Sequence, residues 1–231
     1  MTSLAARERR DEQMDDPALD PQVYDAVLRD LARVNGWTFA SRPTFLFLKR
    51  AATGMFAFRL LDVGFGQGDM LRRIARWARR RNVAVDLVGV DLNPNSADSA
   101  RAATPGWMPI EYRTGDYAVQ PTAFDFVISS LVAHHMTDAQ LQNFITWMER
   151  MATRGWLIND LHRHPLSHWG FPWLARLIGA HRIVREDGQL SIARSFRPAE
   201  WQAILSQAGV PEGEVRIVRR FPFRLCVERL R

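Results

Sequence analysis

The chain has 231 residues, 47% of them hydrophobic, so it is long enough for one domain with a well-formed core and elaborations. Its formal net charge is +6, carried almost wholly by arginine because Lys49 is the only lysine. A basic chain brings nucleic acid or an anionic membrane surface into consideration. The arginines are scattered over the faces of expected helices, which favours a solvated surface over a nucleic-acid footprint.

The single cysteine, Cys226, excludes an internal disulfide framework, a cysteine-based zinc site and a cysteine-ligated iron–sulfur cluster. No apolar run approaches the roughly 18 to 20 residues that span a bilayer. The N-terminus is charged and lacks the apolar core of a signal peptide. We therefore expect a cytoplasmic protein.

Residues 1–54 are expected to form an N-terminal flexible segment and a helical cap. The first dozen residues are charged and nearly free of large apolar groups, which is typical of a flexible segment. Asp20 as N-cap and Pro21 at the first helical position begin a helix that Gly36 ends. A second helix is expected over residues 43–52.

From residue 55 to 231 the pattern alternates between strands and helices. The expected strands cover residues 58–64, 85–92, 108–116, 124–132 and 155–161, with helices over 68–80, 94–103 and 137–152 among them. Apolar strands that alternate with helices imply a parallel sheet covered on both faces. The expected fold class is therefore α/β, with a doubly wound, mostly parallel sheet.

The C-terminal part of the chain departs from this alternation. A helix over 197–209 is followed by two strands, 214–221 and 223–231, which only Pro222 separates. So short a link forces an antiparallel pair, because a parallel crossover needs about a dozen residues or more. The sheet is thus expected to have seven strands with an antiparallel last strand. Residues 162–197 exceed a simple connection, and we interpret them as a lid or substrate insertion after the fifth strand.

The stretch LLDVGFGQGD places three glycines directly after the first expected strand. A dinucleotide site would have the pattern G-x-G-x-x-G, but the third glycine position holds Asp69. A helix that begins with a carboxylate is unsuited to a pyrophosphate at its N-terminus, and no G-K-[ST] of a P-loop follows. The pattern D-x-G-x-G-x-G from Asp62 to Gly68 instead suits a ligand without phosphate groups.

Three further features follow the glycine-rich stretch in order. They are VGVDLNP, with Asp91 closing the second strand; TGDY, with Asp116 and Tyr117; and FDFVISSLVAHHM at the fourth strand. Together with the glycine-rich stretch they resemble the class I methyltransferases that use S-adenosylmethionine. The resemblance covers the chain from about residue 55 to its end. It implies a Rossmann-like methyltransferase fold, with S-adenosylmethionine as cofactor and S-adenosylhomocysteine as product.

The resemblance also implies roles for individual residues. The glycines let the backbone approach the amino-acid part of the cofactor, and Asp91 accepts hydrogen bonds from both ribose hydroxyls. Asp116 and Tyr117 meet the adenine edge. The expected cofactor-binding set is Asp62, Gly64, Gly66, Gly68, Asp91, Leu92, Asp116, Tyr117, Ser129 and Ser130.

Two adjacent histidines, His134 and His135, follow the fourth strand at the carboxyl end of the sheet, where such folds bind ligands. The ordinary pKa of histidine suits general-base catalysis. An oxygen acceptor such as a phenol benefits from a base, because its pKa is near 10. We therefore predict that His134 or His135 is the catalytic base.

A second polar cluster, NDLHRHPLSHW, follows the fifth strand, and aromatic residues come after it. His162, Trp169 and Trp173 are expected to contact the acceptor as part of a lid, although the aromatic residues could equally be the buried side of a short helix. Histidine and aspartate also bind zinc or iron, but the resemblance needs no metal here and none is expected. The arginines nearby leave open a peripheral membrane contact.

The class of acceptor is narrowed by motifs that the chain lacks. The fourth strand has neither the Pro-Pro-aromatic tetrapeptide of DNA amino-methyltransferases nor the paired glutamates of arginine methyltransferases, and no cysteine lies where cytosine C5 enzymes need one. The chain is similar to enzymes that methylate quinone precursors and polyketide phenols in bacterial-type secondary metabolism. We predict methylation of a small apolar or aromatic acceptor at a phenolic or polyketide-like hydroxyl. An RNA-modifying methyltransferase and a non-catalytic cofactor-binding relative stay open as alternatives, and EQMDDP has no assigned role.

Overall fold

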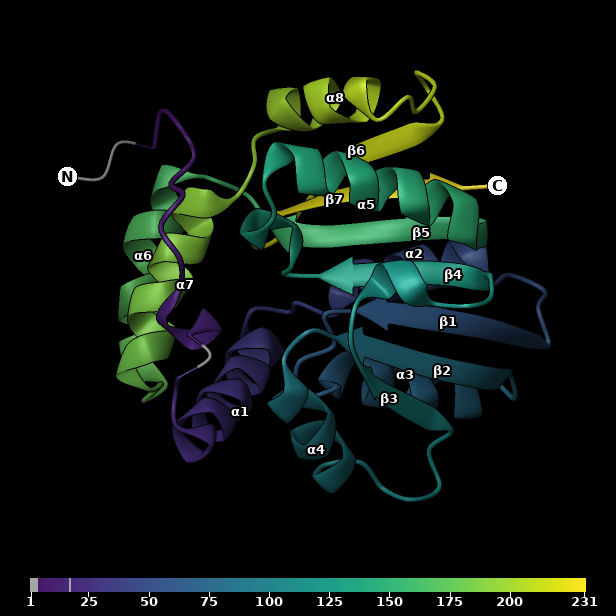
Figure 1. Ribbon diagram of the computed structural model, residues 1–231, viewed down its shortest axis with the longest axis horizontal. Helices are drawn as coiled ribbons and strands as arrows, with labels where there is room; N and C mark the ends of the chain where they lie inside the picture. The colour runs from purple at the N-terminus through teal and green to yellow at the C-terminus, as the bar shows by residue number, and fades with distance from the viewer. Residues whose placement is uncertain (1–3, 17) are drawn as a thin grey trace.

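The computed structural model describes residues 4–16 and 18–231. Its centre is a seven-stranded sheet with the order β3-β2-β1-β4-β5-β7-β6 (Figure 1). The strands are β1 (Ala57–Val63), β2 (Ala84–Asp91), β3 (Ile110–Thr114), β4 (Phe124–Ser130), β5 (Ala152–Leu161), β6 (Val215–Arg220) and β7 (Arg224–Leu230). The first five strands pair in parallel, whereas β7 is antiparallel to both β5 and β6. The predicted fold class is therefore confirmed, including the antiparallel last strand.

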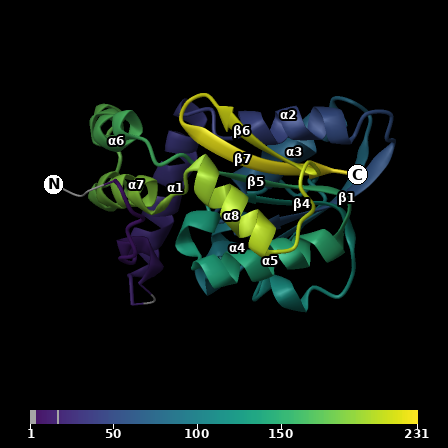
Figure 2. The ribbon, with the colours of Figure 1, turned by 90° about the horizontal axis from the view of Figure 1, so that it is seen from above.

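Helices cover the sheet on both faces, and Figure 2 shows α2 and α3 on one side with α5 and α8 on the other. The helices are α1 (Pro21–Trp37), α2 (Arg42–Ala51), α3 (Asp69–Arg79), α4 (Pro94–Ala102), α5 (Asp138–Met151), α6 (Pro165–Leu177), α7 (Arg182–Arg194) and α8 (Pro198–Gln207). Two large clusters of buried apolar side chains fill the spaces between these layers and the sheet. No helix in the described residues has the length and apolarity needed to cross a membrane.

The helix ends follow from local sequence. The side chain of Asp20 accepts hydrogen bonds from two backbone amides at the start of α1, as the sequence predicts. Thr137 and Gln140 form the predicted capping box of α5. Several element ends differ from the expected bounds by a few residues. The first helix, for example, continues through Gly36 and ends at Trp37, because a single glycine costs a helix only about 1 kcal/mol.

The helices α1, α6 and α7 lie beyond the carboxyl ends of the parallel strands (Figure 1). Residues 162–197, expected as a lid or insertion, form most of this layer as the helix pair α6 and α7. A third apolar cluster joins Val27 and Val34 of α1 to Ala175 of α6 and Val184 of α7. This layer covers the end of the sheet at which ligands bind in such folds.

The N-terminal segment, expected to be flexible, makes specific contacts where the structure describes it. The backbone amide of Glu8 donates to the carbonyl of Ala193 at 3.1 Å, and Arg7 is paired with Asp138 at 2.6 Å. The carboxylate of Asp187 accepts hydrogen bonds from the backbone amides of residues 13 and 14. These contacts hold the segment along α7, next to the ends of the strands (Figure 1).

Candidate active site

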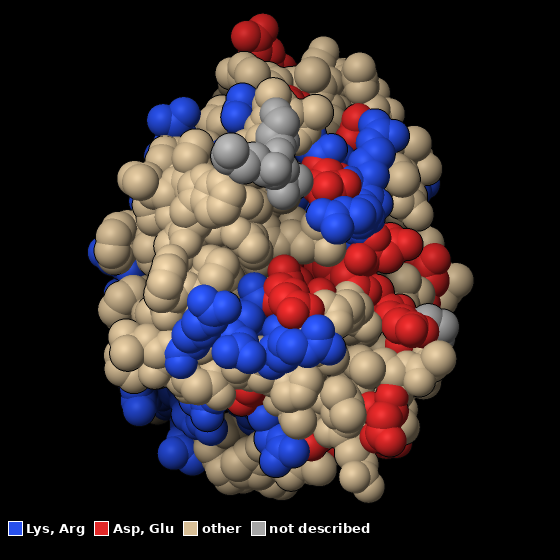
Figure 3. Space-filling model, turned by 90° about the vertical axis from the view of Figure 1, so that its left-hand side faces the viewer, with Lys and Arg blue, Asp and Glu red and all other residues tan. Residues whose placement is uncertain are grey.

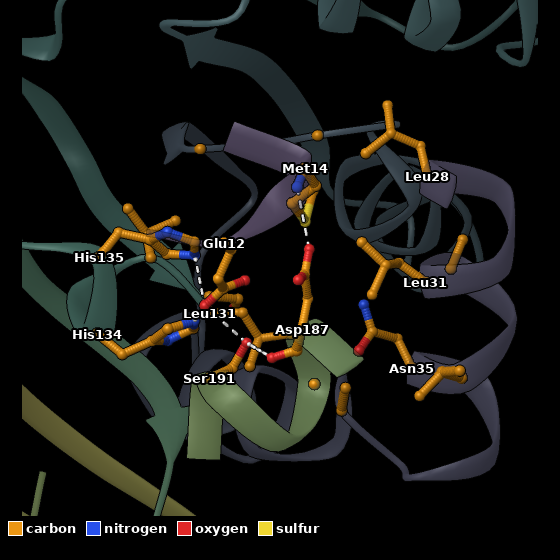
Figure 4. Close-up of a pocket in the computed structure, with 18 of the residues that line it drawn as sticks. Glu12, Met14, Leu28, Leu31, Asn35, Leu131, His134, His135, Asp187 and Ser191 are labelled. Atoms are coloured by element: carbon orange, nitrogen blue, oxygen red, sulfur yellow. Dashed lines mark hydrogen bonds and ion pairs between the residues drawn. The ribbon is translucent and has the colours of Figure 1, made fainter. Parts of the chain in front are cut away.

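A cavity of about 790 Å³ lies between the carboxyl ends of the strands and the layer of α1, α6 and α7. Its wall combines the glycine-rich turn after β1, the residues after β2 and β4, the N-terminal segment and the inner faces of the three helices. Figure 4 shows side chains from these separate segments facing a common space. One cavity of this size can hold a nucleoside-sized ligand together with a small second molecule.

The glycine-rich turn requires glycine at its tightest points. Gly64 and Gly68 have φ angles of +75° and +74°, a left-handed conformation that other residues rarely adopt. A Cβ atom at Gly64 would overlap the side chain of Val132, and one at Gly68 would overlap the ring of Tyr112. The turn therefore brings bare backbone to the edge of the cavity.

Asp91, the last residue of β2, fixes this turn to the neighbouring strand. One carboxylate oxygen accepts from the amide of Gly66 at 2.9 Å, and the other accepts from the amide of Asn93 at 2.9 Å. Burial raises the pKa of Asp91 above its ordinary value, against the opposing effect of these two hydrogen bonds. Asp91 and the following Leu92 both line the cavity.

Asp62 is fully enclosed beneath the glycine-rich turn and also lines the cavity. Its Oδ1 atom has no hydrogen-bond partner within the described part of the chain. Burial, followed by the charges of Asp69 and Asp91, raises its pKa well above the ordinary value. A buried carboxylate without a partner at a cavity wall would be stabilised by a cationic group of a ligand.

The other expected cofactor residues divide into two groups. Tyr117 and Ser130 line the cavity, whereas Gly68, Asp116 and Ser129 are not among its lining residues. Asp116 instead caps the short helix that follows it, and Ser129 donates to a backbone carbonyl of β1 at 2.9 Å. Sequence reasoning did not name the further lining residues Phe65, Gln67, Asn93, Gly115, Leu131 and Val132.

His134 is buried between two carboxylates. Its Nδ1 lies 2.7 Å from Oδ1 of Asp160, and its Nε2 lies 3.5 Å from Oε1 of Glu12. Burial alone would lower the pKa of His134, but the charge and hydrogen bond of Asp160 and then those of Glu12 outweigh it and raise the pKa to about 9. His134 therefore carries a proton at neutral pH and serves as the cation of this cluster.

His135 lies on the cavity side of the same pair, with 28% of its side chain exposed. Its Nδ1 is 2.9 Å from Oδ2 of Asp15, and a carboxylate can only accept, so Nδ1 is the donor. The Nε2 atom lies 3.9 Å from Oε1 of Glu12. Of the two histidines, His135 is the one whose side chain is partly exposed, whereas His134 is buried.

Glu12 completes the cluster from the far end of the chain. It is 4% exposed, and its Oε1 accepts a hydrogen bond from Ser191 of α7 at 2.8 Å (Figure 4). Burial would raise the pKa of Glu12, but the hydrogen bond and charge of His134 outweigh it and lower the pKa. Donor atoms of Glu12, His134 and His135 lie within 4.8 Å of one another, so this set could also hold a metal ion.

The EQMDDP segment, which has no assigned role in the sequence analysis, supplies this wall of the cavity with Glu12, Met14 and Asp15. Their partners are far away in the sequence: Asp15 contacts a residue 120 positions later, and Glu12 one 179 positions later. No local pattern marks such contacts. The only signal in the sequence is a run of acidic residues in a strongly basic chain.

The three expected acceptor residues lie outside the cavity lining. His162 follows β5 and forms an isolated bridge with Phe196, while Trp169 and Trp173 are 54% and 71% exposed on the outer side of α6. The cavity side of that helix instead carries Ser167, Gly170, Phe171 and Leu174. The structure thus brings the histidine pair to the cavity and leaves these three residues away from it.

The strand order, the antiparallel β7 and the glycine-rich turn after β1 define the fold of class I methyltransferases. Human N-acetylserotonin methyltransferase, solved with SAM, aligns with a TM-score of 0.64 and 15% identity over 92% of this chain and 56% of that chain. Magnesium protoporphyrin IX methyltransferase from Synechocystis PCC 6803, solved with SAH, aligns with a TM-score of 0.57 and 16% identity over 90% of this chain and 86% of that chain. The plantazolicin methyltransferase BamL aligns with a TM-score of 0.63 and 14% identity over 89% of this chain and 74% of that chain. At these identities the similarity shows the fold alone.

Comparison of the sequence adds a family-model match and a relative to the similarity in fold. Residues 60–155, from β1 into β5, match the family model described as a methyltransferase domain. An uncharacterised methyltransferase of Synechocystis sp. (strain ATCC 27184 / PCC 6803 / Kazusa) is 31% identical over 122 residues, which are 52% of this chain. The match spans 55% of that relative, so the chain matches about half its length.

Proposed function

We propose that the protein transfers a methyl group from S-adenosylmethionine to a hydroxyl of a small apolar or aromatic acceptor. The observation that carries this proposal is the common cavity, which the glycine-rich turn and Asp91 line at one end and His135 at the other. A methyl donor at the first end and an acceptor at the second would share one enclosed space. Such sharing is what alignment for an in-line displacement requires.

The residues at the first end fit the proposed cofactor. Asp62, buried and without a partner for Oδ1, suits the ammonium group of the methionine part, and Asp91 suits the ribose hydroxyls. Leu92 and Tyr117 provide apolar surface for the adenine. Three acids near the turn, Asp69 among them, would repel phosphate groups and not a sulfonium compound. The solved neighbours with SAM or SAH in their structures support this assignment.

When bound, the cofactor supplies a methyl group on a positively charged sulfur, so little activation is left for the protein to provide. The chain's own task is to orient the acceptor and remove its proton. We assign to Nε2 of His135 the removal of the proton from the acceptor hydroxyl, whose oxygen would then take the methyl group that a bound cofactor supplies. Asp15 on Nδ1 and the nearby Glu12 carboxylate would stabilise the resulting imidazolium.

His134 has a different part in this proposal. It already holds a proton between Asp160 and Glu12, so it cannot accept one from a neutral hydroxyl. Its ring lies 4.3 Å from the ring of His135, centroid to centroid, and its charge fixes the orientation of Glu12. We assign His134 as a positioning residue and His135 as the base.

The proposal is tested by incubating the purified protein with methyl-labelled S-adenosylmethionine and, in separate reactions, phenols, quinols, polyketide-like compounds and RNA. Label is expected in a free phenol and not in the methyl ether of the same compound, because only the former has a transferable proton on oxygen. Equal labelling of both would indicate carbon methylation and contradict the hydroxyl assignment. Label confined to RNA, with binding that weakens steeply as salt rises, would contradict the small acceptor.

A further inference from the structure

An unusual share of large apolar side chains is exposed at the end of the molecule that carries α6. On α6 these are Leu166, Trp169, Trp173 and Leu177, with 69%, 54%, 71% and 84% of each residue exposed. Their spacing of three or four residues places them on one face of the helix. The other faces of α6 contact α7 and the cavity, so the helix is apolar toward solvent as well as toward the protein.

Two neighbouring segments extend this surface. The turn between β6 and β7 exposes Phe221 and Phe223, at 70% and 37%, and the end of α1 exposes Trp37 and Phe39, at 64% and 54%. We call these four side chains and the four on α6 the apolar rim. Contiguous exposed surface of this kind marks an interaction site on a monomeric protein.

Direct contacts join the three parts of the apolar rim. The ring of His164, the residue before α6, lies 5.1 Å from the ring of Phe223. The guanidinium of Arg224, the residue after Phe223, donates at 3.3 Å to the hydroxyl of Thr38, which stands between Trp37 and Phe39 just after α1. These contacts place α6, the β6–β7 turn and the end of α1 next to one another.

Part of the apolar rim borders the cavity. Leu166 and Phe223 are members of the rim and also line the cavity, and Thr38 and Ser41 line it beside the end of α1. The same cavity is lined by His135, so the rim and the proposed base border one space. A partner that covers the rim would therefore also deliver the acceptor.

Positive charge accompanies the apolar rim. Arg176 lies beside Trp173, with its guanidinium 5.7 Å from the ring, Arg219 precedes the β6–β7 turn, and Arg42 follows the end of α1. All three are exposed, and in the part of the chain that the structure describes none of them forms an ion pair. Figure 3 faces this end of the molecule and shows a wide uncharged area with groups of basic side chains beside it, and with acidic side chains near the centre and along the right-hand side of the view.

We propose that the apolar rim docks on an anionic lipid bilayer, and that the acceptor is an amphiphile which enters the cavity from the membrane. Tryptophan and phenylalanine in the rim would sit at the level of the headgroups, while the unpaired arginines face anionic phosphates. The docking is independent of catalysis. The identity of the acceptor as an amphiphile rests on the proposed function.

Flotation with vesicles tests the docking. The protein is expected to bind vesicles of phosphatidylcholine mixed with phosphatidylglycerol about tenfold or more tightly than phosphatidylcholine alone, because the arginines add electrostatic attraction. The double substitution Leu177→Glu with Phe221→Glu is expected to remove binding to the mixed vesicles. Phe56→Glu is the matched control, since Phe56 is 88% exposed but precedes β1 at the opposite end of the sheet, and it should bind as the unchanged protein does.

Each result is interpreted beside a measurement of S-adenosylmethionine binding by the same samples. Failure to bind anionic vesicles, with normal cofactor binding, overturns the docking and leaves the proposed function intact. A dimer that the double substitution converts to monomer, again without vesicle binding, identifies the apolar rim as a contact between copies and overturns the docking. Vesicle binding without cofactor binding supports the docking and overturns the proposed function.

Discussion

The two ends of the cavity are assembled in different ways. At the cofactor end, the contact of Gly66 with Asp91 joins residues 25 positions apart, through adjacent parallel strands. At the acceptor end, the contact of Glu12 with Ser191 joins residues 179 positions apart, and His134 reaches Asp160 on another strand. The first end is one supersecondary unit, whereas the second depends on the whole fold.

The two ends also differ in how far the family model covers them. The turn and strand of the cofactor end lie inside residues 60–155, the region that matches the family model. Of the acceptor end, His134 and His135 lie inside this region, whereas their partners Glu12 and Asp160, and Ser191, lie outside it. Substitutions at the acceptor end should therefore leave cofactor binding unchanged, and the following experiments test whether the two ends are independent in this way.

The largest effect is expected from His135→Ala. Loss of the general base should lower kcat for a phenolic acceptor roughly 100-fold or more, without weakening cofactor binding. Steady-state kinetics with labelled cofactor measure this, with His164→Asn as the control because asparagine can still cap α6. An unchanged kcat in His135→Ala would contradict the assignment of His135 as the general base.

A second expectation concerns stability and pH. The folded pKa of His134 is raised from 6.5 to about 9, so its stabilising ion pairs are fully present below pH 6.5 and are lost as pH rises through about 9. The free energy of unfolding should fall by on the order of 3 kcal/mol across that window. The substitution Asp160→Asn should make the free energy of unfolding depend less on pH, because Asp160 is the strongest charge that keeps His134 protonated. Chemical denaturation at several pH values measures how the free energy of unfolding changes with pH. An equal change in the variant would contradict the assignment of this pH dependence to the ion pair of His134 with Asp160.

A smaller effect is expected from Asp187→Asn, which weakens the attachment of the N-terminal segment to α7. The carboxylate accepts from the backbone amides of Gln13 and Met14, and hydrogen bonds to a charged group contribute about 1.5 to 3 kcal/mol. The variant should be cleaved faster by protease within residues 7–16 and should show a higher KM for the acceptor. If the KM for the cofactor rises equally, the two ends are not separable.

The separation also explains what could be predicted from the sequence. The strands, the capping residues and the glycine-rich turn were all predictable, because periodicity and local hydrogen bonds determine them. The pairing of His135 with Asp15 was not, since it depends on how the N-terminal segment lies across α7. Helix α6 presents a related difficulty, because a helix with apolar residues on several faces gives no indication that Phe171 faces the cavity and Trp173 the solvent.

The most direct test of the central claim is calorimetry with S-adenosylmethionine on the unchanged protein, Asp91→Ala and His135→Ala. The account predicts binding by the unchanged protein, at least tenfold weaker binding by Asp91→Ala, about 1.4 kcal/mol, and unchanged binding by His135→Ala. Absence of binding by the unchanged protein, or equal weakening in the two variants, would contradict a cavity with a separate cofactor end and acceptor end.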